Sequence, residues 1–425
     1  MIKYTRTWLL ALIIPFAFVA CNKDDNNQPK KTMVEVLDET MAEWYLWNDK
    51  IPNLISSDYS SPNTYFEDLL VEQDKWSFIA NLDQLMAYLT SGSYYGYGFD
   101  LKFEEGNDIP RVSLVYNESD LYDEGISRGW KLTEIDNQSI NTMTVDQINT
   151  AVAGSSNTFT FENNEGEVKT LSLTKKEMNQ NSVIKRTIIH TENEKVAYLV
   201  FDSFLSSSEE ELNEAFDYFK ANGAEELVLD LRYNGGGSTY ISNQLAGLIT
   251  GNIFQGEIYS KTFHNESKTN ENFTEAFYDQ SSAYGFNRVF IITTSSTASA
   301  SEMVINGLKP YLGEENVILI GSTTHGKPVG MYVFEESKYD LAIVPISFSI
   351  TNANDEGNYF EGISVDYEIS DDLSHDFGDI DESNFRAALE YINQGNFPIV
   401  TAAKSLSTSE REFKKKGLDE LIDAN

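Results

Sequence analysis

The feature that most constrains the fold is a series of short apolar strands that alternates with amphipathic helices in the second half of the chain. Strands are predicted at residues 196–200, 227–231, 288–293, 317–320 and 341–344, and a helix at 206–222. This alternation is typical of a sheet that helices bury on its faces. Pro345 either stops the last strand or places it at a sheet edge. Because 425 residues suffice for two or three domains, we expect a multidomain α/β protein whose core spans residues 177–402.

Residues 33–92 are expected to form a small N-terminal helical domain. Val34, Leu37 and Met41 fall on one helical stripe, and a second apolar helix is predicted at 65–71. The aromatic cluster at 44–47 admits two interpretations, a ligand-binding box or core packing. Core packing is favoured, because large aromatic rings dominate the cores of small domains.

Residues 93–176 change to short strands. Strand candidates at 111–115 and 132–136 precede a helix near 145–152 and a hairpin that turns at 163–166. The order and length resemble a PDZ domain. The resemblance implies that Gly96, Tyr97, Gly98 and Phe99 form the loop that binds a terminal carboxylate. Converging backbone N–H groups would hold the carboxylate, and the following strand edge would pair with the peptide. The simpler interpretation is a glycine turn before a strand. Trp130 replaces the Asp that is usual in such protease domains, which leaves the ligand preference open.

The N-terminus indicates the compartment. A short basic region precedes an apolar run at 8–20, which is too short to span a bilayer and suits a signal peptide of residues 1–20. Cys21, the single cysteine, follows directly, and the segment resembles a bacterial lipobox. A plain secretory signal or a buried free thiol are the alternatives. Residues 21–32 are polar and are expected to form a tether. Residues 22–25 resemble the surface-export signal of Bacteroidetes-like lipoproteins. We therefore expect a lipid-anchored outer-membrane protein, either periplasmic or surface-exposed.

The composition excludes several classes of partner. With 67 acidic and 31 basic residues the net charge is −36, and such a surface repels nucleic acid. Four histidines and one cysteine leave little from which to build a zinc site. We expect no metal and no other cofactor. The acidic tract 371–382 is predicted to be a solvated loop, and residues 403–425 a charged tail.

A buried strand runs into a glycine-rich loop at residues 230–237, Asp-Leu-Arg-Tyr-Asn-Gly-Gly-Gly. Such a loop could cradle a phosphate, but nucleotide-binding motifs need a lysine or a third glycine at fixed offsets, and both are missing here. The glycines do offer unobstructed N–H groups, which are the material of an oxyanion hole.

Two further segments carry chemistry. Residues 295–302, Ser-Ser-Thr-Ala-Ser-Ala-Ser-Glu, connect a strand to an apolar helix and place Ser299 at the helix start, where negative charge is favoured. Ser299 and Glu302 also fit a simple capping box. Lys327 follows Gly326 in a polar loop. A loop lysine is ordinarily solvated, and it becomes a base only where burial lowers its pKa.

Together the three segments resemble the carboxyl-terminal processing, or tail-specific, proteases of peptidase family S41. The resemblance implies an α/β core of ββα repeats similar to crotonase and ClpP. It also implies Ser299 as nucleophile, Lys327 as base, and the backbone N–H groups of Gly236 and Ala300 as oxyanion donors. The substrates would be proteins or peptides. Two rival readings remain open, a catalytically weakened binding lipoprotein and a hydrolase of a non-peptide envelope polymer.

Three departures from the family pattern stand out. The segment 310–316 is predicted to be a lengthened loop between helix and strand, and Met331 stands where a glutamine often follows the lysine. His325 replaces an aromatic residue, and it is the nearest candidate for a second partner of Lys327.

Overall fold

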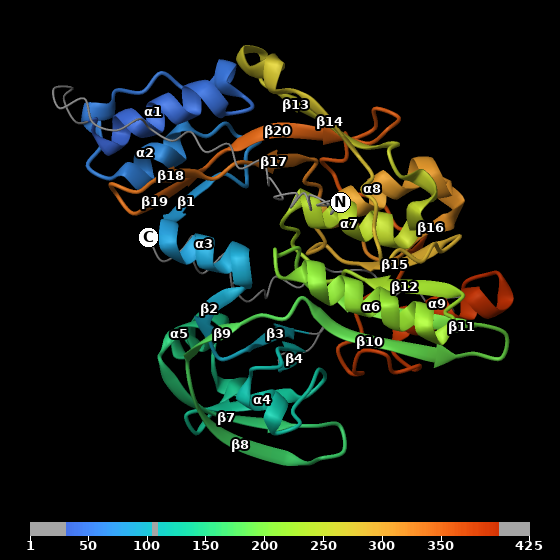
Figure 1. The fold of residues 1–425 in the computed structure, drawn as a ribbon. Coiled ribbons are helices and arrows are strands. Elements are labelled where there is room, and N and C mark those ends of the chain that lie inside the picture. The colour runs from blue at the N-terminus through green and yellow to red at the C-terminus, as the bar shows by residue number, and fades with distance from the viewer. Residues whose placement is uncertain (1–30, 104–108, 399–425) are drawn as a thin grey trace, which may run out of the picture.

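A six-stranded sheet organises the α/β core, in the order β10-β11-β12-β15-β16-β21 (Figure 1). All its neighbours pair in parallel except β10 and β11, which are antiparallel. The structure is a computed structural model that describes residues 31–103 and 109–398. The strands are β10 (Val183–His190), β11 (Lys195–Phe201), β12 (Glu226–Asp230), β15 (Val289–Thr293), β16 (Val317–Gly321) and β21 (Tyr367–Glu368).

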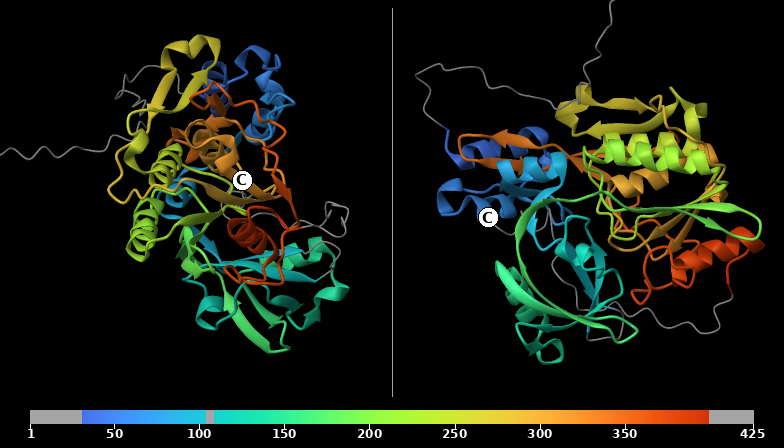
Figure 2. Two further views of the ribbon diagram at one scale, coloured as in Figure 1. Left: turned by 90° about the vertical axis from the view of Figure 1, so that its right-hand side faces the viewer. Right: turned by 60° about the horizontal axis from the view of Figure 1, so that its bottom comes forward.

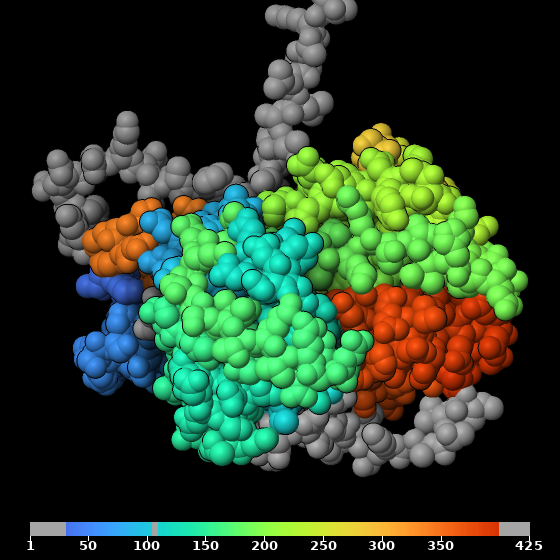
Figure 3. Space-filling view, turned by 90° about the horizontal axis from the view of Figure 1, so that it is seen from below, coloured from blue at the N-terminus to red at the C-terminus, as the bar shows by residue number. Residues whose placement is uncertain are grey.

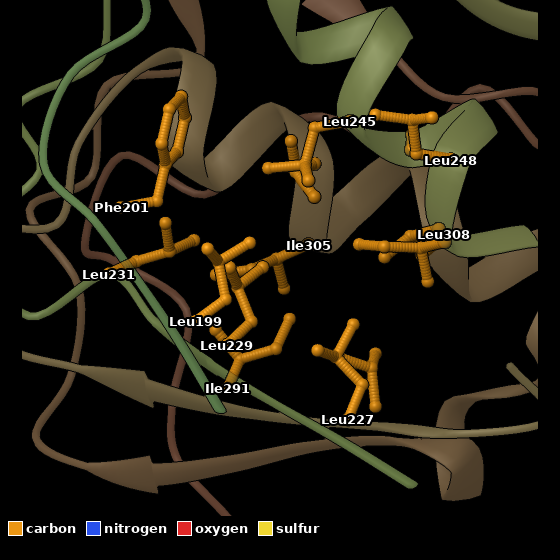
Figure 4. Packing of buried hydrophobic residues seen from close by; sticks show 14 of the residues in the cluster. Leu199, Phe201, Leu227, Leu229, Leu231, Leu245, Leu248, Ile291, Ile305 and Leu308 are labelled. Carbon is orange, nitrogen blue, oxygen red and sulfur yellow. The ribbon is translucent and has the colours of Figure 1, made fainter. Parts of the chain in front are cut away.

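Helices cover both faces of this sheet, as the alternation of strands and helices predicts. One face packs against α6 (Ser208–Asn222), α7 (Thr239–Thr250) and α8 (Ala300–Leu312), and the other against α9 (Ser383–Gln394) (Figures 1 and 2). Figure 4 shows leucines of β12 and α7 in the first of these layers, with Ile305 and Leu308 of α8 drawn between them. Successive residues of β11 alternate between the two layers, so a strand in a doubly covered sheet must be apolar throughout.

The N-terminal helices do not have a core of their own. The elements of this unit are α1 (Met33–Trp44), α2 (Pro62–Leu69), β1 (Phe78–Asn81) and α3 (Leu82–Ser91). The strand β1 pairs with β19 (Leu341–Val344), which also pairs with β18 (Phe334–Glu336). Leu37 and Met41 accordingly pack in one cluster with Leu341 and Ile343. A long-range strand pair therefore joins the N-terminal unit to the core.

The structure tests three local predictions, which concern Pro345, the aromatic cluster at 44–47 and the segment 310–316. The strand β19 lies between β1 and β18, so Pro345 ends the strand and does not place it at a sheet edge. Tyr45 and Trp47 of the aromatic cluster are buried in the core, as the packing interpretation predicts. The segment around Pro310 is not a long loop, since α8 continues through Pro310 to Leu312.

A second small sheet follows the order β14-β13-β20-β17 and lies beside the N-terminal unit. Its strands are β13 (Ile258–His264), β14 (Phe273–Ala276), β17 (Val329–Met331) and β20 (Ile346–Thr351). The β17 edge of this sheet begins two residues after Lys327, so the small sheet positions the loop that carries the lysine.

Residues 93–179 form a β-rich domain below the core in Figure 1. The chain enters through β2 (Ser93–Gly96) and leaves through β9 (Lys176–Asn179), and the two pair antiparallel as a ribbon between domain and core. The domain sheet has the order β3-β4-β5-β7-β8, with β3 at its edge. Its elements are β3 (Phe99–Phe103), β4 (Pro110–Val115), β5 (Lys131–Ile135), α5 (Val145–Ala153), β7 (Ser156–Glu162) and β8 (Val168–Thr174). The predicted helix and hairpin are both present.

A carboxyl group lies at the junction of this domain with the core. Asp202 follows β11, and its Oδ2 accepts hydrogen bonds from Tyr116 Oη at 3.0 Å and Gln180 Nε2 at 2.6 Å. Burial, together with the charge of nearby Asp100, raises the pKa of Asp202 to about 7. The folded protein therefore keeps a proton that an unfolded chain releases near pH 4.

We predict that the contribution of Asp202 to the stability of the protein falls as pH rises from about 4.5 to 7, because ionised Asp202 is penalised only in the folded state. Asp202→Asn removes the ionisation and keeps an oxygen that accepts both hydrogen bonds. Its free energy of unfolding should exceed the wild-type value by on the order of 2 kcal/mol at pH 8, and by much less at pH 4.5. Urea unfolding at several pH values measures the difference. Asp217→Asn, at an exposed position of α6, should show no such pH-dependent gain, and an equal gain there would contradict the assignment.

Candidate active site

Three loops leave neighbouring strands at the carboxyl edge of the parallel sheet. The glycine loop (residues 231–238) follows β12, the serine turn (294–299) follows β15, and the lysine loop (322–328) follows β16. The strands pair in the order β12-β15-β16, so the loops emerge side by side. This edge is where open α/β sheets build their binding sites.

Ser299 has an unusual backbone conformation. It directly precedes α8 and has φ 55° and ψ −113°, in a region that side-chain-bearing residues rarely occupy. Such a conformation costs on the order of 1–3 kcal/mol and persists only where the surroundings enforce it. Two bonds to the glycine loop help to enforce it: Ala298 N–H donates to Asn234 O at 3.0 Å, and Thr297 Oγ1 donates to Leu231 O at 2.8 Å.

The buried carboxylate of Glu302 ties the serine turn to the lysine loop. Its Oε2 accepts from Ser299 N–H at 2.9 Å and from Lys327 N–H at 2.8 Å. Its Oε1 accepts from Gly326 N–H and from Thr324 Oγ1, each at 2.6 Å. The side chain is fully buried. The capping residue expected from sequence therefore also fixes the backbone of Lys327 beside that of Ser299.

The turn at Gly326 allows Lys327 to approach the serine turn. Gly326 has φ 89°, and a Cβ there would lie 2.4 Å from Phe360 O. Only glycine fits this position. Lys327, like Ser299, is partly buried.

The glycine loop lies against the other side of the serine turn. A Cβ on Gly236, which has φ 103°, would lie 2.8 Å from Ser299 Cβ and 3.0 Å from Ala300 N. Gly236 N–H itself donates to Asn234 Oδ1 at 2.9 Å. The Gly236 N–H group, expected from the sequence to be an oxyanion donor, therefore already has an acceptor within the loop. It can bind an oxyanion only if it releases Asn234 Oδ1. Ala300 N–H stands at the first position of α8, where helix geometry provides no intrahelical acceptor.

His325, the candidate partner of Lys327 from the sequence, has contacts with two other groups. Its Nε2 accepts from Trp76 Nε1–H at 3.0 Å, and its Nδ1 lies 3.3 Å from Ser295 O. The pairing of His325 with the lysine amine therefore stays a prediction from the sequence. Trp76 belongs to the N-terminal unit, and nothing in its local sequence predicted a place beside this loop.

The acidic tract is not a solvated loop. Asp371 accepts from Arg232 Nη1 at 2.7 Å and from Arg128 Nη2 at 2.8 Å, and Tyr233 Oη also donates to it. Glu382 is fully buried and binds Arg232. Burial alone would raise the pKa of Asp371, but the two guanidinium groups hold it well below its usual value. The prediction of a solvated tract was wrong for Asp371 and Glu382, although residues 379–381 are exposed. Local composition does not reveal the buried arginines that pair with these two carboxylates.

The β-rich domain touches two of the three loops through this network. Arg128 of the domain donates to Tyr233 of the glycine loop at 2.5 Å, and Lys102 of β3 donates to Ser296 Oγ of the serine turn at 3.3 Å. Figure 3 shows the domain directly against the C-terminal segment that carries Asp371. Sequence reasoning missed Arg128, Asp371 and Glu382, whose roles depend on contacts between segments far apart in the chain.

The four residues of the expected carboxylate loop lie at the start of the domain sheet. Gly96 ends β2, Phe99 begins β3, and Tyr97 and Gly98 form the turn between them. Tyr97 is buried, and its hydroxyl donates to Gly154 O, at the end of α5, at 2.9 Å. The loop, the β3 edge and α5 are therefore adjoining parts of one surface.

Some expectations lie outside the described residues. Cys21, the signal peptide 1–20, most of the tether 21–32 and the tail 403–425 all fall there. Over residues 31–103 and 109–398, no helix is both long and apolar enough to cross a membrane. Within the same ranges, no three or more His, Cys, Asp or Glu side chains gather as metal ligands.

Comparisons with known proteins agree with this arrangement. Residues 195–369 match Peptidase family S41, and residues 35–78 match the Peptidase S41 N-terminal domain. A probable CtpA-like serine protease of Staphylococcus epidermidis is 24% identical over 288 residues, 66% of this chain and 54% of the relative. The chloroplastic carboxyl-terminal-processing peptidase 2 of Arabidopsis thaliana is 23% identical over 332 residues, 72% of this chain and 59% of the relative. The chain thus spans little more than half the length of these relatives.

A solved structure shares the fold. The putative S41 protease from Bacteroides fragilis superposes with a TM-score of 0.71 at 23% identity, covering 86% of this chain and 99% of that one. The family assignment rests on the sequence matches of the core and of the N-terminal unit: the chain belongs to peptidase family S41.

We predict that Glu302→Gln loosens the link between the serine turn and the lysine loop, because an amide nitrogen cannot accept the N–H bonds that one carboxylate oxygen now receives. Labelling of Ser299 by a fluorophosphonate probe should slow by about 10²-fold or more, while circular dichroism stays native. Ser301→Ala, which removes a hydrogen bond to Asn234 O from the same helix turn, is the matched control and should slow labelling far less. Normal labelling of Glu302→Gln would show that the carboxylate is only a helix cap.

Proposed function

We propose that this protein is a serine endopeptidase in which Ser299 attacks the peptide bond and Lys327 acts as its base. The observation that carries the proposal is the position of both residues on one buried carboxylate, with their backbone N–H groups bound to the same oxygen of Glu302. The strained backbone of Ser299 at the start of α8 supports it, since strain of this kind gathers at functional sites.

The proposed reaction is acyl transfer. Neutral Lys327 takes the proton of Ser299 Oγ, which attacks the carbonyl carbon of the substrate. Ala300 N–H, at the positive end of the α8 dipole, stabilises the oxyanion. Gly236 N–H completes the oxyanion hole when it exchanges Asn234 Oδ1 for the substrate oxygen. The protonated lysine then gives its proton to the leaving amine, and water hydrolyses the acyl-enzyme.

Peptide hydrolysis should require both residues of the pair. Ser299→Ala and Lys327→Ala should each lower kcat by about 10⁴-fold or more, and the double variant should be hardly slower, because the two act as one unit. Hydrolysis by the wild type should increase with pH until the lysine is neutral. Cleavage of an unfolded protein, followed by mass spectrometry of the products, measures these effects. Folded single variants that still cleave would refute the mechanism, and a wild type that never cleaves would favour the binding-lipoprotein alternative.

We further propose that the β-rich domain acts as a PDZ domain that recognises substrate C-termini. Among the described residues β3 is the terminal strand of the domain sheet, where a peptide strand would be added, and the Tyr97-Gly98 turn precedes it. The contacts of Arg128 and Lys102 with the glycine loop and the serine turn give an occupied groove a physical route to the active site.

A peptide with a free C-terminal carboxylate should bind this domain more tightly than the same peptide amidated, by about tenfold or more, because the loop amides would pair with the charge. Fluorescence anisotropy with Ser299→Ala protein compares the two without cleavage. Substitution of Gly98 is a poor probe, since a Cβ there would lie 2.7 Å from Ser119 Cβ and disturb the packing. Equal affinities for the two peptides would remove the carboxylate-binding role.

The envelope location is proposed from the sequence alone. Cys21 at the end of an apolar run supports a diacylated N-terminus that anchors the enzyme to a bacterial membrane. Cys21→Ser should abolish incorporation of labelled palmitate, and unchanged incorporation would place the lipid elsewhere.

A further inference from the structure

An aromatic cluster flanks the lysine loop. Trp76 lies 6.3 Å from His325 and 6.4 Å from Phe360, measured between ring centroids. The side chain of Phe360 is 42% exposed, His325 is also exposed, and Trp76 is partly so. Three segments far apart in the chain thus bring their rings to one surface two residues from Lys327.

Backbone contacts fix the main chain that carries these rings. Asp74 Oδ1 accepts from Trp76 N–H at 2.9 Å, and His325 N–H donates to Thr297 O at 2.9 Å. Phe360 O lies against Gly326, which fixes the position of its backbone relative to the lysine loop. Segments whose main chain is already fixed lose less conformational freedom when they bind a ligand.

The loops follow a fixed spatial order across the site. The glycine loop contacts the serine turn through Asn234 and Ala298, and the serine turn contacts the lysine loop through Thr297 and His325. The lysine loop in turn contacts residues 360–363. The aromatic cluster therefore lies on the lysine side of Ser299, opposite the glycine loop.

The chemistry of the proposed reaction assigns the two sides different parts of the substrate. The carbonyl oxygen must face the oxyanion donors, on the side of Ala300 and the glycine loop. The leaving nitrogen must come within hydrogen-bond reach of Lys327, which returns the proton to it. The residues that follow the scissile bond hence extend on the lysine side, where the aromatic rings lie.

We propose that Trp76, His325 and Phe360 form a subsite for an apolar side chain in the leaving part of the substrate, directly after the scissile bond. The inference rests on the proposed peptidase function and deepens it. The N-terminal unit then contributes to substrate choice through Trp76, and the enzyme selects bulky apolar residues at this position over glycine.

The acyl-enzyme offers a direct test, because an added amine can enter the leaving-group site and replace water. The amine nitrogen attacks the acyl carbon, a new amide bond forms, the bond to Ser299 Oγ breaks, and Oγ regains a proton. During hydrolysis of a cleaved peptide, phenylalaninamide and glycinamide are supplied at equal concentration, and mass spectrometry measures the ratio of the two transfer products.

The wild type should favour phenylalaninamide about tenfold or more, the discrimination typical of a hydrophobic pocket. Trp76→Ala and Phe360→Ala should each bring the ratio close to one. Phe360→Ala controls for misfolding of the N-terminal unit, since Phe360 lies outside that unit and is 42% exposed. Phe273→Ala is the matched control, because Phe273 is a similarly exposed ring on β14 and should leave the ratio unchanged.

The outcomes are distinguishable. A wild-type ratio near one, or a ratio that both aromatic variants leave unchanged, overturns the subsite while the peptidase stands. A ratio that falls equally in Phe273→Ala also overturns it. A protein that neither cleaves peptides nor reacts at Ser299 overturns the proposed function, and the subsite with it.

Discussion

The buried carboxylate of Glu302 is the interaction on which the site depends. Four hydrogen bonds converge on its two oxygens, three from backbone N–H groups and one from Thr324. A buried charge is costly without such partners, and charge-assisted bonds offset that cost. The consequence is mutual dependence: the lysine loop needs the carboxylate to hold its turn, and the carboxylate needs the lysine loop to remain buried.

The parallel sheet explains why three short loops are enough to build the site. Paired strands deliver the glycine loop, the serine turn and the lysine loop to one edge, and each loop needs only short-range contacts with the next. The N-terminal unit and the β-rich domain then reach this edge from outside, through Trp76 and through Arg128 and Lys102. Both accessory parts therefore contact side chains of the loops that carry the proposed chemistry.

Local sequence predicted the central strands β11, β12, β15 and β16, the helix α6 and the identity of the three loops, because each depends on periodicity or on glycine and capping residues within a few positions. It did not predict the helices α7 and α9. It could not predict that β1 pairs with β19, since strand pairing over such a separation leaves no local trace. The same limit applies to His325, whose approach to Trp76 depends on that pairing. The prediction for the acidic tract 371–382 failed at its buried carboxylates for a related reason. Charge alone does not reveal whether a carboxylate contacts water or a buried guanidinium.

The ionic network around Asp371 links the β-rich domain to the glycine loop, so its free energy determines how strongly the domain influences that loop. Asp371 is shared by Arg128 of the domain and Arg232 of the loop, and Tyr233 donates to the same carboxylate. Removing one partner from such a network typically costs about 3–5 kcal/mol, because it leaves a charge buried without compensation. Movement of the domain away from the core would therefore change the interactions of Arg232 and Tyr233. Those residues directly precede Asn234, whose side chain holds the Gly236 amide. A peptide bound at β3 would thus change the availability of the Gly236 amide without touching it. The condition is that the bound peptide shifts the equilibrium between two arrangements of the Asp371 carboxylate.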